Sequence, residues 1–378
     1  MKRLICFFVC LAAFIPYAVH AEGEMIDGVE AKACILVEAS TGEVLREMNA
    51  DERLPIASVT KIMTMLLIME RIDSGTLSFD DMVSVSEHAM SYGGSTMFLE
   101  AGERLSVNDM MKGIAVASAN DGCVAMAEHL AGSEGAFVDM MNARAKELGM
   151  ENTHFMNTNG LDEDGHYSSA RDVAIMSCEL LKHPKITDFT SIWTDELRGG
   201  KFQLANTNKL IRFYTGANGL KTGSTSQALC CLSAAAKRND MQLVAVVLGA
   251  PTSDKRFGSA RALLDHGFAN YSLLQLAKGG EELCDAAVIN GEEDSVKAVV
   301  AGDKTRLINR ADGREPERVV TLNEEIQAPV KKGDVIGRLE FIQNGGAVES
   351  VDLIAGTDVK RKSVVRIMLD IISSIVLG

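Results

Sequence analysis

The sequence predicts an α+β protein with two domains: an antiparallel sheet packed with helices, followed by a smaller β-domain. Strand patterns lie at both ends of the larger region, and long helical patterns lie between them. Beyond Leu273 the apolar segments become short, often alternate with polar residues, and are separated by polar turns. A chain of 378 residues is long enough for more than one domain and for a substantial core.

The strand patterns of the larger region form two predicted hairpins. Residues 33–37 and 43–46 flank the turn sequence Ser40-Thr41-Gly42. Residues 228–236 and 241–248 are two apolar runs separated by a polar turn. Because these hairpins stand at opposite ends of the region, the simplest arrangement is one antiparallel sheet built from both ends.

Helical patterns fill the stretch between the hairpins, and one more follows the second hairpin. Pro55 precedes an apolar-rich run that predicts a largely buried helix, and Ser106 begins a sequence that resembles a capping box. We expect the middle helices to form a lobe of their own. The predicted helices span residues 57–70, 106–117, 121–130, 134–148, 169–183 and 259–268.

The two ends of the chain predict an exported protein attached to a membrane surface. Residues 1–21 have the basic start, apolar stretch and small residues of a signal peptide, with a membrane anchor as the alternative. Residues 358–378 predict an amphipathic helix that lies on an anionic membrane surface, with docking on the protein's own core as the alternative. The larger domain is then expected over residues 22–272 and the β-domain over residues 273–357.

Charge and cysteine content exclude several classes of protein. A formal net charge of −14 argues against nucleic acid as a partner, because phosphate binding requires clustered lysine and arginine. Six cysteines remain after the signal peptide; an even number permits disulfides, but apolar surroundings favour buried thiols. No spacing typical of a metal site occurs, so no metal is expected, and the serine chemistry described below implies no organic cofactor.

Ser58 and Lys61 form the first of three short motifs that carry chemistry. Residues three apart share a helix face, so Lys61 is expected beside the Ser58 hydroxyl. A serine becomes a nucleophile when a base takes its proton, and a lysine with a lowered pKa can be that base. Ser58 also stands at a helix start, where free N–H groups favour developing negative charge. Alone, the motif is also typical of a buried helix start with a solvated lysine.

Ser118-Ala119-Asn120 is the second motif, between two predicted helices. Ser118 could relay a proton toward a leaving amine. Asn120 can donate a hydrogen bond to a substrate carbonyl and accept one from a lysine. Alone, this motif is equally typical of a helix cap.

Lys221-Thr222-Gly223 is the third motif, just before the second hairpin. Lys221 and Thr222 offer a positive charge and a hydroxyl to a carboxylate. Gly223 lets an extended peptide approach the edge of a strand closely. An ordinary edge strand with a solvated lysine is the alternative. The three motifs in this order nevertheless indicate a serine acyl-enzyme site.

The motif set resembles that of the penicillin-recognising serine enzymes. The chain is similar, over nearly its whole mature length, to the D-alanyl-D-alanine carboxypeptidases among the low-molecular-mass penicillin-binding proteins. The resemblance implies a β-lactamase- and transpeptidase-like fold for the larger domain, and it includes the β-domain and the terminal helix. The stretches that carry it are residues 55–61, 94–99, 164–172, 219–223 and 328–333.

The resemblance also implies a role for each site residue. Ser58 is acylated and Lys61 is its base, while Ser118 and Asn120 assist proton transfer and positioning. Lys221 binds the substrate carboxylate.

Two further residues enter only through the resemblance. Arg256, a loop residue on sequence grounds, matches an arginine that helps to hold the terminal carboxylate. The backbone N–H groups of Ser58 and Ser224 are expected to form the oxyanion hole.

The implied activity is a penicillin-sensitive serine carboxypeptidase of cell-wall and cell-shape biogenesis. It removes the terminal D-alanine from peptidoglycan pentapeptides that end in D-Ala-D-Ala, and β-lactams acylate the same serine. Its expected location is peripheral, on the outer face of the bacterial cytoplasmic membrane. The alternatives are a β-lactamase, a D,D-transpeptidase and a catalytically inactive wall-binding protein.

Overall fold

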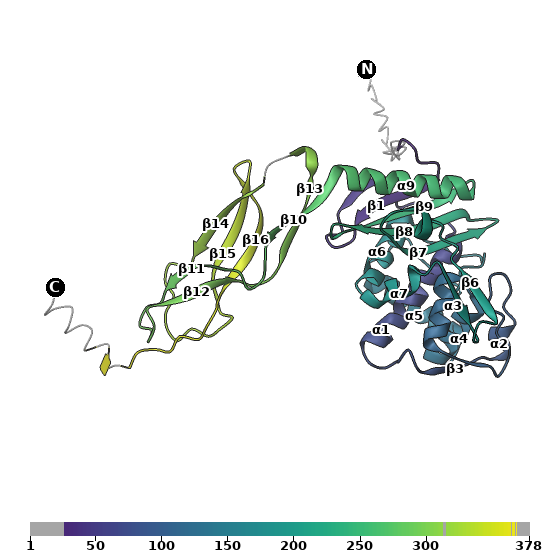
Figure 1. The fold of residues 1–378 in the computed structure, drawn as a ribbon, viewed down its shortest axis with the longest axis horizontal. Helices are drawn as coiled ribbons and strands as arrows, with labels where there is room; N and C mark the ends of the chain where they lie inside the picture. The colour runs from purple at the N-terminus through teal and green to yellow at the C-terminus, as the bar shows by residue number, and fades with distance from the viewer. Residues whose placement is uncertain (1–25, 313–314, 364, 367, 369–378) are drawn as a thin grey trace, which may run out of the picture.

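The structure is a computed structural model that describes residues 26–312, 315–363, 365–366 and 368. A helix-packed sheet is followed by a separate β-domain, which confirms the predicted α+β architecture (Figure 1). The predicted signal peptide, residues 1–21, lies outside the described residues.

One antiparallel sheet in the order β2-β1-β9-β8-β7 forms the larger domain. Its strands are β1 (Ala33–Glu38), β2 (Val44–Met48), β7 (Ala217–Thr225), β8 (Leu229–Arg238) and β9 (Met241–Ala250). Both predicted hairpins are confirmed, as β1 with β2 and β8 with β9. Because β1 also pairs with β9, the two ends of the domain share one sheet, and β7 is left at its edge.

The central strands are buried on both faces, so their side chains divide between two cores. Ile35 and Val246 belong to the core that faces the middle helices. Leu36 and Val247, one residue further along each strand, belong to the core beneath helix α9 (Ser253–Asn270). This alternation follows from the two-residue period of a strand and explains why these strands are nearly continuously apolar. In Figure 1, α9 and α6 lie on opposite sides of the sheet.

The predicted middle helices are present, and serine side chains begin several of them. Ser106, Ser133 and Ser169 each accept a hydrogen bond from the backbone N–H three residues later. The helices are α1 (Lys61–Asp73), α3 (Val107–Val116), α4 (Asn120–Ala131), α5 (Glu134–Glu147) and α6 (Ala170–Leu181). The shorter elements of this lobe are β3 (Met82–Ser84), α2 (Glu87–Met90), β4 (Arg104–Ser106), η2 (Pro184–Ile186), α7 (Thr187–Thr190), β5 (Thr194–Leu197), β6 (Phe202–Ala205) and α8 (Leu210–Phe213).

Two helix starts differ from the sequence prediction. The first helix begins as a 3₁₀ turn, η1 (Ala57–Thr60), before it continues as α1. Helix α9 begins at Ser253 rather than Ser259, because the Thr252 side chain accepts from the backbone N–H of Lys255 at 3.2 Å. Arg256 therefore lies in the first turn of a helix and not in a loop.

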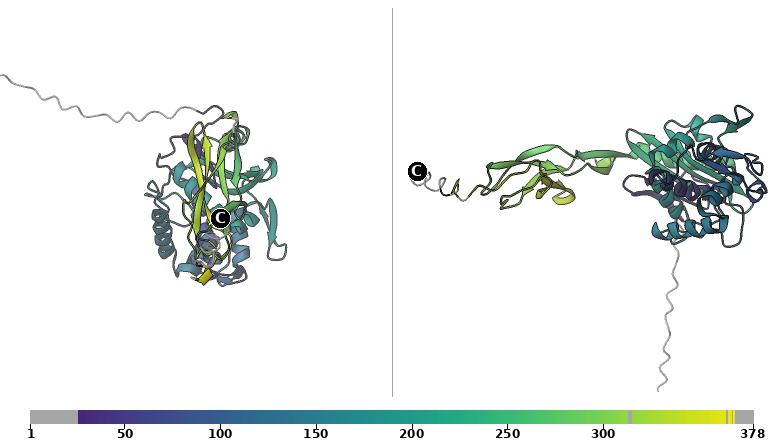
Figure 2. Two further views of the ribbon diagram at one scale, coloured as in Figure 1. Left: turned by 90° about the vertical axis from the view of Figure 1, so that its left-hand side faces the viewer. Right: turned by 90° about the horizontal axis from the view of Figure 1, so that it is seen from below.

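The β-domain follows α9 directly and extends away from the larger domain in Figures 1 and 2. It contains a sheet in the order β11-β12-β16-β15-β14 and a separate ribbon of β10 and β13. Its apolar core includes Leu339, Phe341 and Leu353. The strands are β10 (Tyr271–Ala277), β11 (Glu282–Ala287), β12 (Ser295–Val300), β13 (Lys304–Asn309), β14 (Glu317–Leu322), β15 (Val335–Gln343) and β16 (Gly346–Ala355), with the 3₁₀ turn η3 (Arg310–Asp312) after β13.

Most of the predicted tail helix, residues 358–378, lies outside the described residues. Its first residues are not helical, because Val359 and Arg361 form β-bridges with Val330 and Gly291. Val359 is 1% exposed and belongs to the core of the β-domain. Across the part of the chain that the structure describes, no helix combines the length and the apolar character that crossing a membrane requires.

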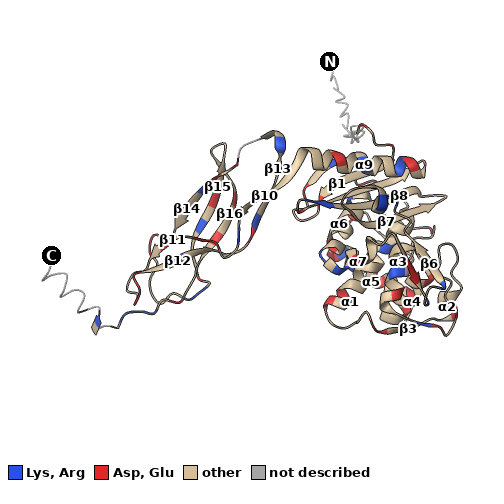
Figure 3. Cartoon of the chain, in the orientation of Figure 1, with Lys and Arg blue, Asp and Glu red and all other residues tan. Residues whose placement is uncertain are grey.

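Charged residues of both signs are dispersed over both domains (Figure 3). All six cysteines of the described residues are free thiols, three of them fully buried. Lys61 and Lys221 are exceptions to the usual exposure of lysine, since both are among the largest fully buried side chains. Both lie in the predicted site.

Candidate active site

Ser58 lies in the 3₁₀ turn η1, and Lys61 stands where this turn becomes α1. A 3₁₀ helix has three residues per turn, so side chains three apart lie directly above one another. Lys61 Nζ is accordingly 2.9 Å from Ser58 Oγ, as the first motif predicts. Ser58 remains partly exposed while Lys61 is fully buried, so a substrate can reach the hydroxyl but not the amine.

Two carbonyl oxygens hold the Lys61 amine. Nζ donates to Asn120 Oδ1 and to the backbone oxygen of Asn159, each at 2.7 Å. A neutral amine has two N–H groups and one lone pair, so these acceptors leave the lone pair facing Ser58. Burial lowers the pKa of Lys61 to about 8, only partly opposed by Asp121 and Cys123. The amine is thus placed and tuned to take the Ser58 proton.

The backbone around Ser58 is tightly enclosed. Ala57 has φ +48°, a conformation that costs a non-glycine residue roughly 1–3 kcal/mol. A side-chain carbon at Gly160 would come within 1.9 Å of the Ala57 oxygen, and one at Gly223 within 2.9 Å of the Ser58 nitrogen. Only glycine allows these segments to approach so closely, and the Gly223 contact puts β7 beside the Ser58 N–H.

Thr60 and His166 support the same turn. Thr60 Oγ1 donates to the Ala57 oxygen at 2.9 Å and lies 2.8 Å from His166 Nε2. His166 Nδ1 accepts from the Met156 N–H, so Nε2 carries the proton and donates to Thr60. Burial lowers the pKa of His166 to about 4, which keeps the ring neutral.

Ser118 and Asn120 lie at the junction of α3 and α4, both buried. Ser118 has φ +64°, another strained position for a non-glycine residue. Asn120 accepts from Lys61 and donates from Nδ2 to the Gly93 oxygen at 2.8 Å. The second motif thus contributes a direct contact to Lys61, while the proton-transfer role of Ser118 stays a prediction.

Lys221, Thr222 and Gly223 lie on the edge strand β7. Lys221 is 1% exposed, and its Nζ donates to the Thr222 oxygen at 3.0 Å. Burial lowers the pKa of Lys221 well below its usual value, and the positive charge of Lys61 lowers it further. The Thr222 hydroxyl lies 2.6 Å from the Thr207 hydroxyl. The edge position fits the predicted pairing with an extended peptide.

Arg256 reaches β7 from the first turn of α9. Its Nη1 donates to the Gly223 oxygen at 3.1 Å and its Nη2 to Ser253 Oγ at 3.2 Å. Its Nε is buried without a hydrogen-bond partner among the described residues. Burial also lowers the pKa of this guanidinium. Arg256 thus joins the third motif, as the resemblance implies.

Ser224 follows Gly223 on β7 and is exposed. Its N–H and that of Ser58 therefore belong to two segments in contact at Gly223. The oxyanion hole itself stays a prediction.

Several residues that shape the site carry no motif signal. The oxygens of Gly93 and Asn159 hold Asn120 and Lys61, and a backbone oxygen leaves no trace in side-chain identity. The Asp121 carboxylate accepts from the backbone N–H groups of Met97 and Leu99 and so anchors the loop that contains Gly93. Of the described residues, no group of three His, Cys, Asp or Glu side chains is arranged to hold a metal ion.

Comparisons with known proteins agree with this geometry. The sequence matches the D-alanyl-D-alanine carboxypeptidase family over residues 19–252 and the penicillin-binding protein 5 C-terminal domain over residues 271–361. The D-alanyl-D-alanine carboxypeptidase DacF of Bacillus subtilis is 43% identical over 96% of this chain and 95% of its own length.

Two solved structures extend this likeness. Penicillin binding protein 5 from Haemophilus influenzae is 32% identical, with a TM-score of 0.76 over 90% of this chain and 100% of its own. Penicillin-binding protein D2 from Listeria monocytogenes, in its ampicillin-bound form, is 34% identical, with a TM-score of 0.56 over 64% of this chain and 98% of its own.

Proposed function

The chain belongs to the D-alanyl-D-alanine carboxypeptidase family, and we propose that it removes the terminal D-alanine from peptidoglycan pentapeptides through an acyl-enzyme on Ser58. One observation carries this proposal: a buried lysine amine, held by two carbonyl oxygens, lies 2.9 Å from a partly exposed serine hydroxyl. That arrangement provides a nucleophile and its base without any further group.

Substrate binding begins at the C-terminal carboxylate of the peptide. Lys221, Thr222 and Arg256 are the groups proposed to receive it, and the peptide backbone extends along the edge strand β7. A carboxylate next to Lys221 favours its charged form, which reverses the effect of burial on that lysine. Binding therefore places the penultimate carbonyl carbon near Ser58 Oγ.

Acylation follows as the Ser58 oxygen attacks that carbonyl carbon and its proton passes to Lys61 Nζ. Negative charge develops on the carbonyl oxygen, and the N–H groups of Ser58 and Ser224 are proposed to stabilise it. The carbon–nitrogen bond then breaks, and the departing amine of D-alanine takes a proton from Lys61 with the help of Ser118. An ester on Ser58 remains.

Deacylation returns the enzyme to its starting state. A water molecule gives a proton to Lys61 as its oxygen bonds to the ester carbon. The Ser58 oxygen leaves and recovers that proton from Lys61, and the shortened peptide, released as a carboxylic acid, gives its own proton to solvent and departs as a carboxylate. We propose that β-lactams enter the same path, acylate Ser58 and deacylate slowly; an ampicillin-bound relative supports this.

The decisive experiment is the release of D-alanine from a D-Ala-D-Ala peptide, with and without penicillin. The wild-type protein should release D-alanine and take up labelled penicillin. In the Ser58→Ala protein, the rates of both reactions should be at least about 10⁴-fold lower. Label uptake by Ser58→Ala would contradict the proposal. Fast loss of the label would indicate a β-lactamase, exchange without net release a transpeptidase, and no uptake an inactive wall-binding protein.

We also propose that the protein is exported and lies peripherally on the outer face of the cytoplasmic membrane. The signal-peptide pattern of residues 1–21 and the amphipathic pattern near the C-terminus support this location. A protein truncated after Ser363 tests the tail as an anchor. The cut is placed there because Val359 is buried in the β-domain and Lys362 donates its N–H to the Asn290 oxygen. This protein should no longer sediment with membranes, and if it still does, the tail is not the anchor.

A further inference from the structure

Two backbone oxygens determine how the catalytic amine is held. The Asn159 oxygen accepts directly from Lys61 Nζ, and the Gly93 oxygen accepts from Asn120 Nδ2, whose Oδ1 in turn accepts from Lys61. These oxygens belong to loops far apart in the sequence. A shift of either loop would turn the lone pair of the Lys61 amine away from Ser58 Oγ.

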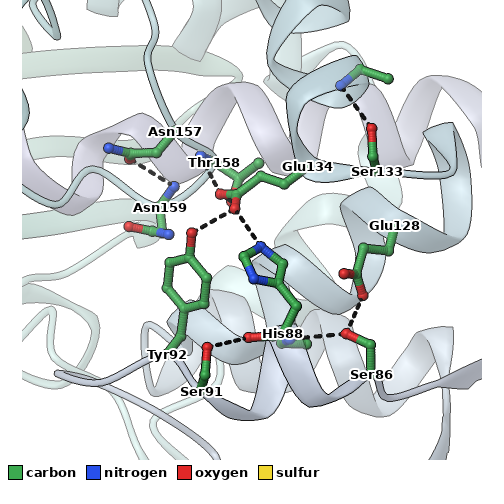
Figure 4. Close-up of polar contacts among 12 residues, drawn as sticks. Ser86, His88, Ser91, Tyr92, Glu128, Ser133, Glu134, Asn157, Thr158 and Asn159 are labelled. Carbon is green, nitrogen blue, oxygen red and sulfur yellow. Dashed lines mark hydrogen bonds and ion pairs between the residues drawn. The ribbon is translucent and has the colours of Figure 1, made fainter.

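One carboxylate joins the residues that directly precede those two oxygens. Glu134 Oε2 accepts from the Tyr92 hydroxyl at 2.5 Å, and Glu134 Oε1 accepts from the Thr158 hydroxyl at 2.9 Å. The Thr158 backbone N–H adds a bond of 3.3 Å to the same oxygen. Figure 4 shows Tyr92, Thr158 and His88 converging on the Glu134 side chain.

Glu134 is anchored well enough to hold both loops in place. It is the first residue of α5, whose start is already capped by Ser133. Its side chain is 12% exposed, and a carboxylate removed from water to that extent requires partners. Most of its acceptor capacity is used by the two loops rather than by its own helix. We propose that Glu134 is a positioning residue for acylation: it ties the Tyr92–Gly93 loop to the Thr158–Asn159 segment and thereby orients Lys61.

This role is mechanical and does not depend on the charge of Glu134 acting on the lysine. The groups that raise the pKa of Lys61 are Cys123 and Asp121. Glutamine at position 134 keeps the length of the side chain and an oxygen acceptor for Thr158, and its amide can donate to the Tyr92 oxygen. A glutamine variant therefore separates shape from charge.

The chain offers a matched control in Glu128. It is a partly buried glutamate on the neighbouring helix α4, and its Oε2 accepts from Ser86 Oγ at 2.6 Å. Ser86 caps the short helix α2, which precedes the Tyr92–Gly93 loop, but its side chain bonds with Ala89 and Glu128 and with none of Tyr92, Gly93, Thr158 or Asn159. The Glu128→Ala variant therefore loses a partly buried carboxylate and its contact with a helix cap on the same side of the site, while the bonds of Glu134 to Tyr92 and Thr158 stay in place.

The test compares full-length wild-type, Glu134→Ala, Glu134→Gln and Glu128→Ala proteins. Acylation by labelled penicillin, kcat and KM for D-alanine release, and the thermal midpoint are measured for each. The Glu134→Ala protein should be acylated about 20-fold more slowly than wild type, because misplacement of the Lys61 amine by a fraction of an ångström is costly. Its kcat should fall, while its KM should stay within about twofold of the wild-type value. Glu134→Gln should stay within about threefold of wild type, and Glu128→Ala should acylate normally despite a lowered midpoint.

Acylation of folded Glu134→Ala within about twofold of wild type would overturn the proposal, as would parallel losses in Glu134→Ala and Glu128→Ala. If the Glu134→Ala protein does not fold, the Tyr92→Phe and Thr158→Val proteins test the proposal in its place, since each removes one hydroxyl contact with little change of shape. Each should slow acylation about threefold to fivefold, and wild-type rates in both would overturn the proposal. The inference rests on the proposed function, whose failure is distinguishable: the wild-type protein itself would then neither acylate nor release D-alanine.

Discussion

The two buried lysines of the site sit in opposite kinds of surroundings. Lys61 has three hydrogen-bond partners, Ser58, Asn120 and Asn159, all within 2.9 Å. Lys221 donates to a neighbouring backbone oxygen, and close to it the Nε of Arg256 is buried without a partner among the described residues. The Lys61 amine is held on all sides by its acceptors and Ser58, although the neighbouring Asn159 Nδ2 is itself buried without a partner among the described residues. By contrast, no carboxylate of the described residues pairs with Lys221 or Arg256.

The difference indicates where substrate binding acts. Burying a cation without an opposite charge beside it is costly, and both Lys221 and Arg256 have a pKa lowered by burial. A substrate carboxylate would supply the missing charge and offset that cost. The Lys61 end needs no such change, because its acceptors already hold the amine against Ser58. Substitutions at the two ends should therefore affect different kinetic steps.

Between the two lysines, the larger effect is expected from Lys61→Ala. Loss of the base should slow acylation by labelled penicillin on the order of 10³-fold, because a positioned general base contributes about 10²- to 10⁴-fold. KM for the peptide should change far less. A stopped-flow measurement of acylation checks this, with the thermal midpoint as a control for folding. Rapid acylation of Lys61→Ala would assign the base role to another group.

Lys221→Met should have the next largest effect, and it should fall on binding. The expected loss in kcat/KM is on the order of 10²-fold for a peptide that ends in a free carboxylate, since truncating one partner of a buried charge pair costs about 2–5 kcal/mol. A peptide with a C-terminal amide provides the matched control, because it lacks the charge that Lys221 binds. Equal losses for both peptides would contradict a carboxylate-binding role.

The pH dependence of acylation tests the base end in the unmodified protein. The active form of Lys61 is neutral, and its pKa is lowered to about 8. About a tenth of the enzyme is then competent at pH 7, so the acylation rate should rise roughly tenfold toward a plateau above pH 8. The rate is measured at saturating labelled penicillin, which separates it from binding at Lys221. A flat profile from pH 6 to pH 9 would contradict this assignment.

Thr207→Val should have the smallest effect. It removes the hydroxyl 2.6 Å from that of Thr222 and leaves a side chain of nearly the same shape. Loss of one neutral hydrogen bond is worth about 1 kcal/mol, so KM should rise about fivefold with kcat nearly unchanged. Steady-state kinetics of D-alanine release check this. A larger loss in kcat than in KM would link Thr207 to the chemical end.

Much of the fold could be predicted because its signals are local. The hairpin turns, the serine caps at Ser106 and Ser169 and the apolar runs of the central strands all report conformation over a few residues. The start of α9 was missed, because Thr252 and Ser253 are too polar to continue the apolar pattern on which the prediction depended. The tail from Asp358 was assigned to a helix, although Val359 is held by the β-domain, a contact that periodicity does not reveal.

The features of the site also divide into those that the sequence predicts and those that only tertiary contacts reveal. The sequence alone predicted which side chains come together at the site, because serine, lysine and asparagine are needed for what their functional groups do and cannot be exchanged freely. Only the tertiary structure decided how Lys61 is oriented, since the Gly93 and Asn159 oxygens that hold it exist in every residue and act through position. It also assigned Glu134, whose importance lies in joining two loops far apart in the chain. Functional groups are encoded by residue type, but their geometry is set by contacts that no single segment contains.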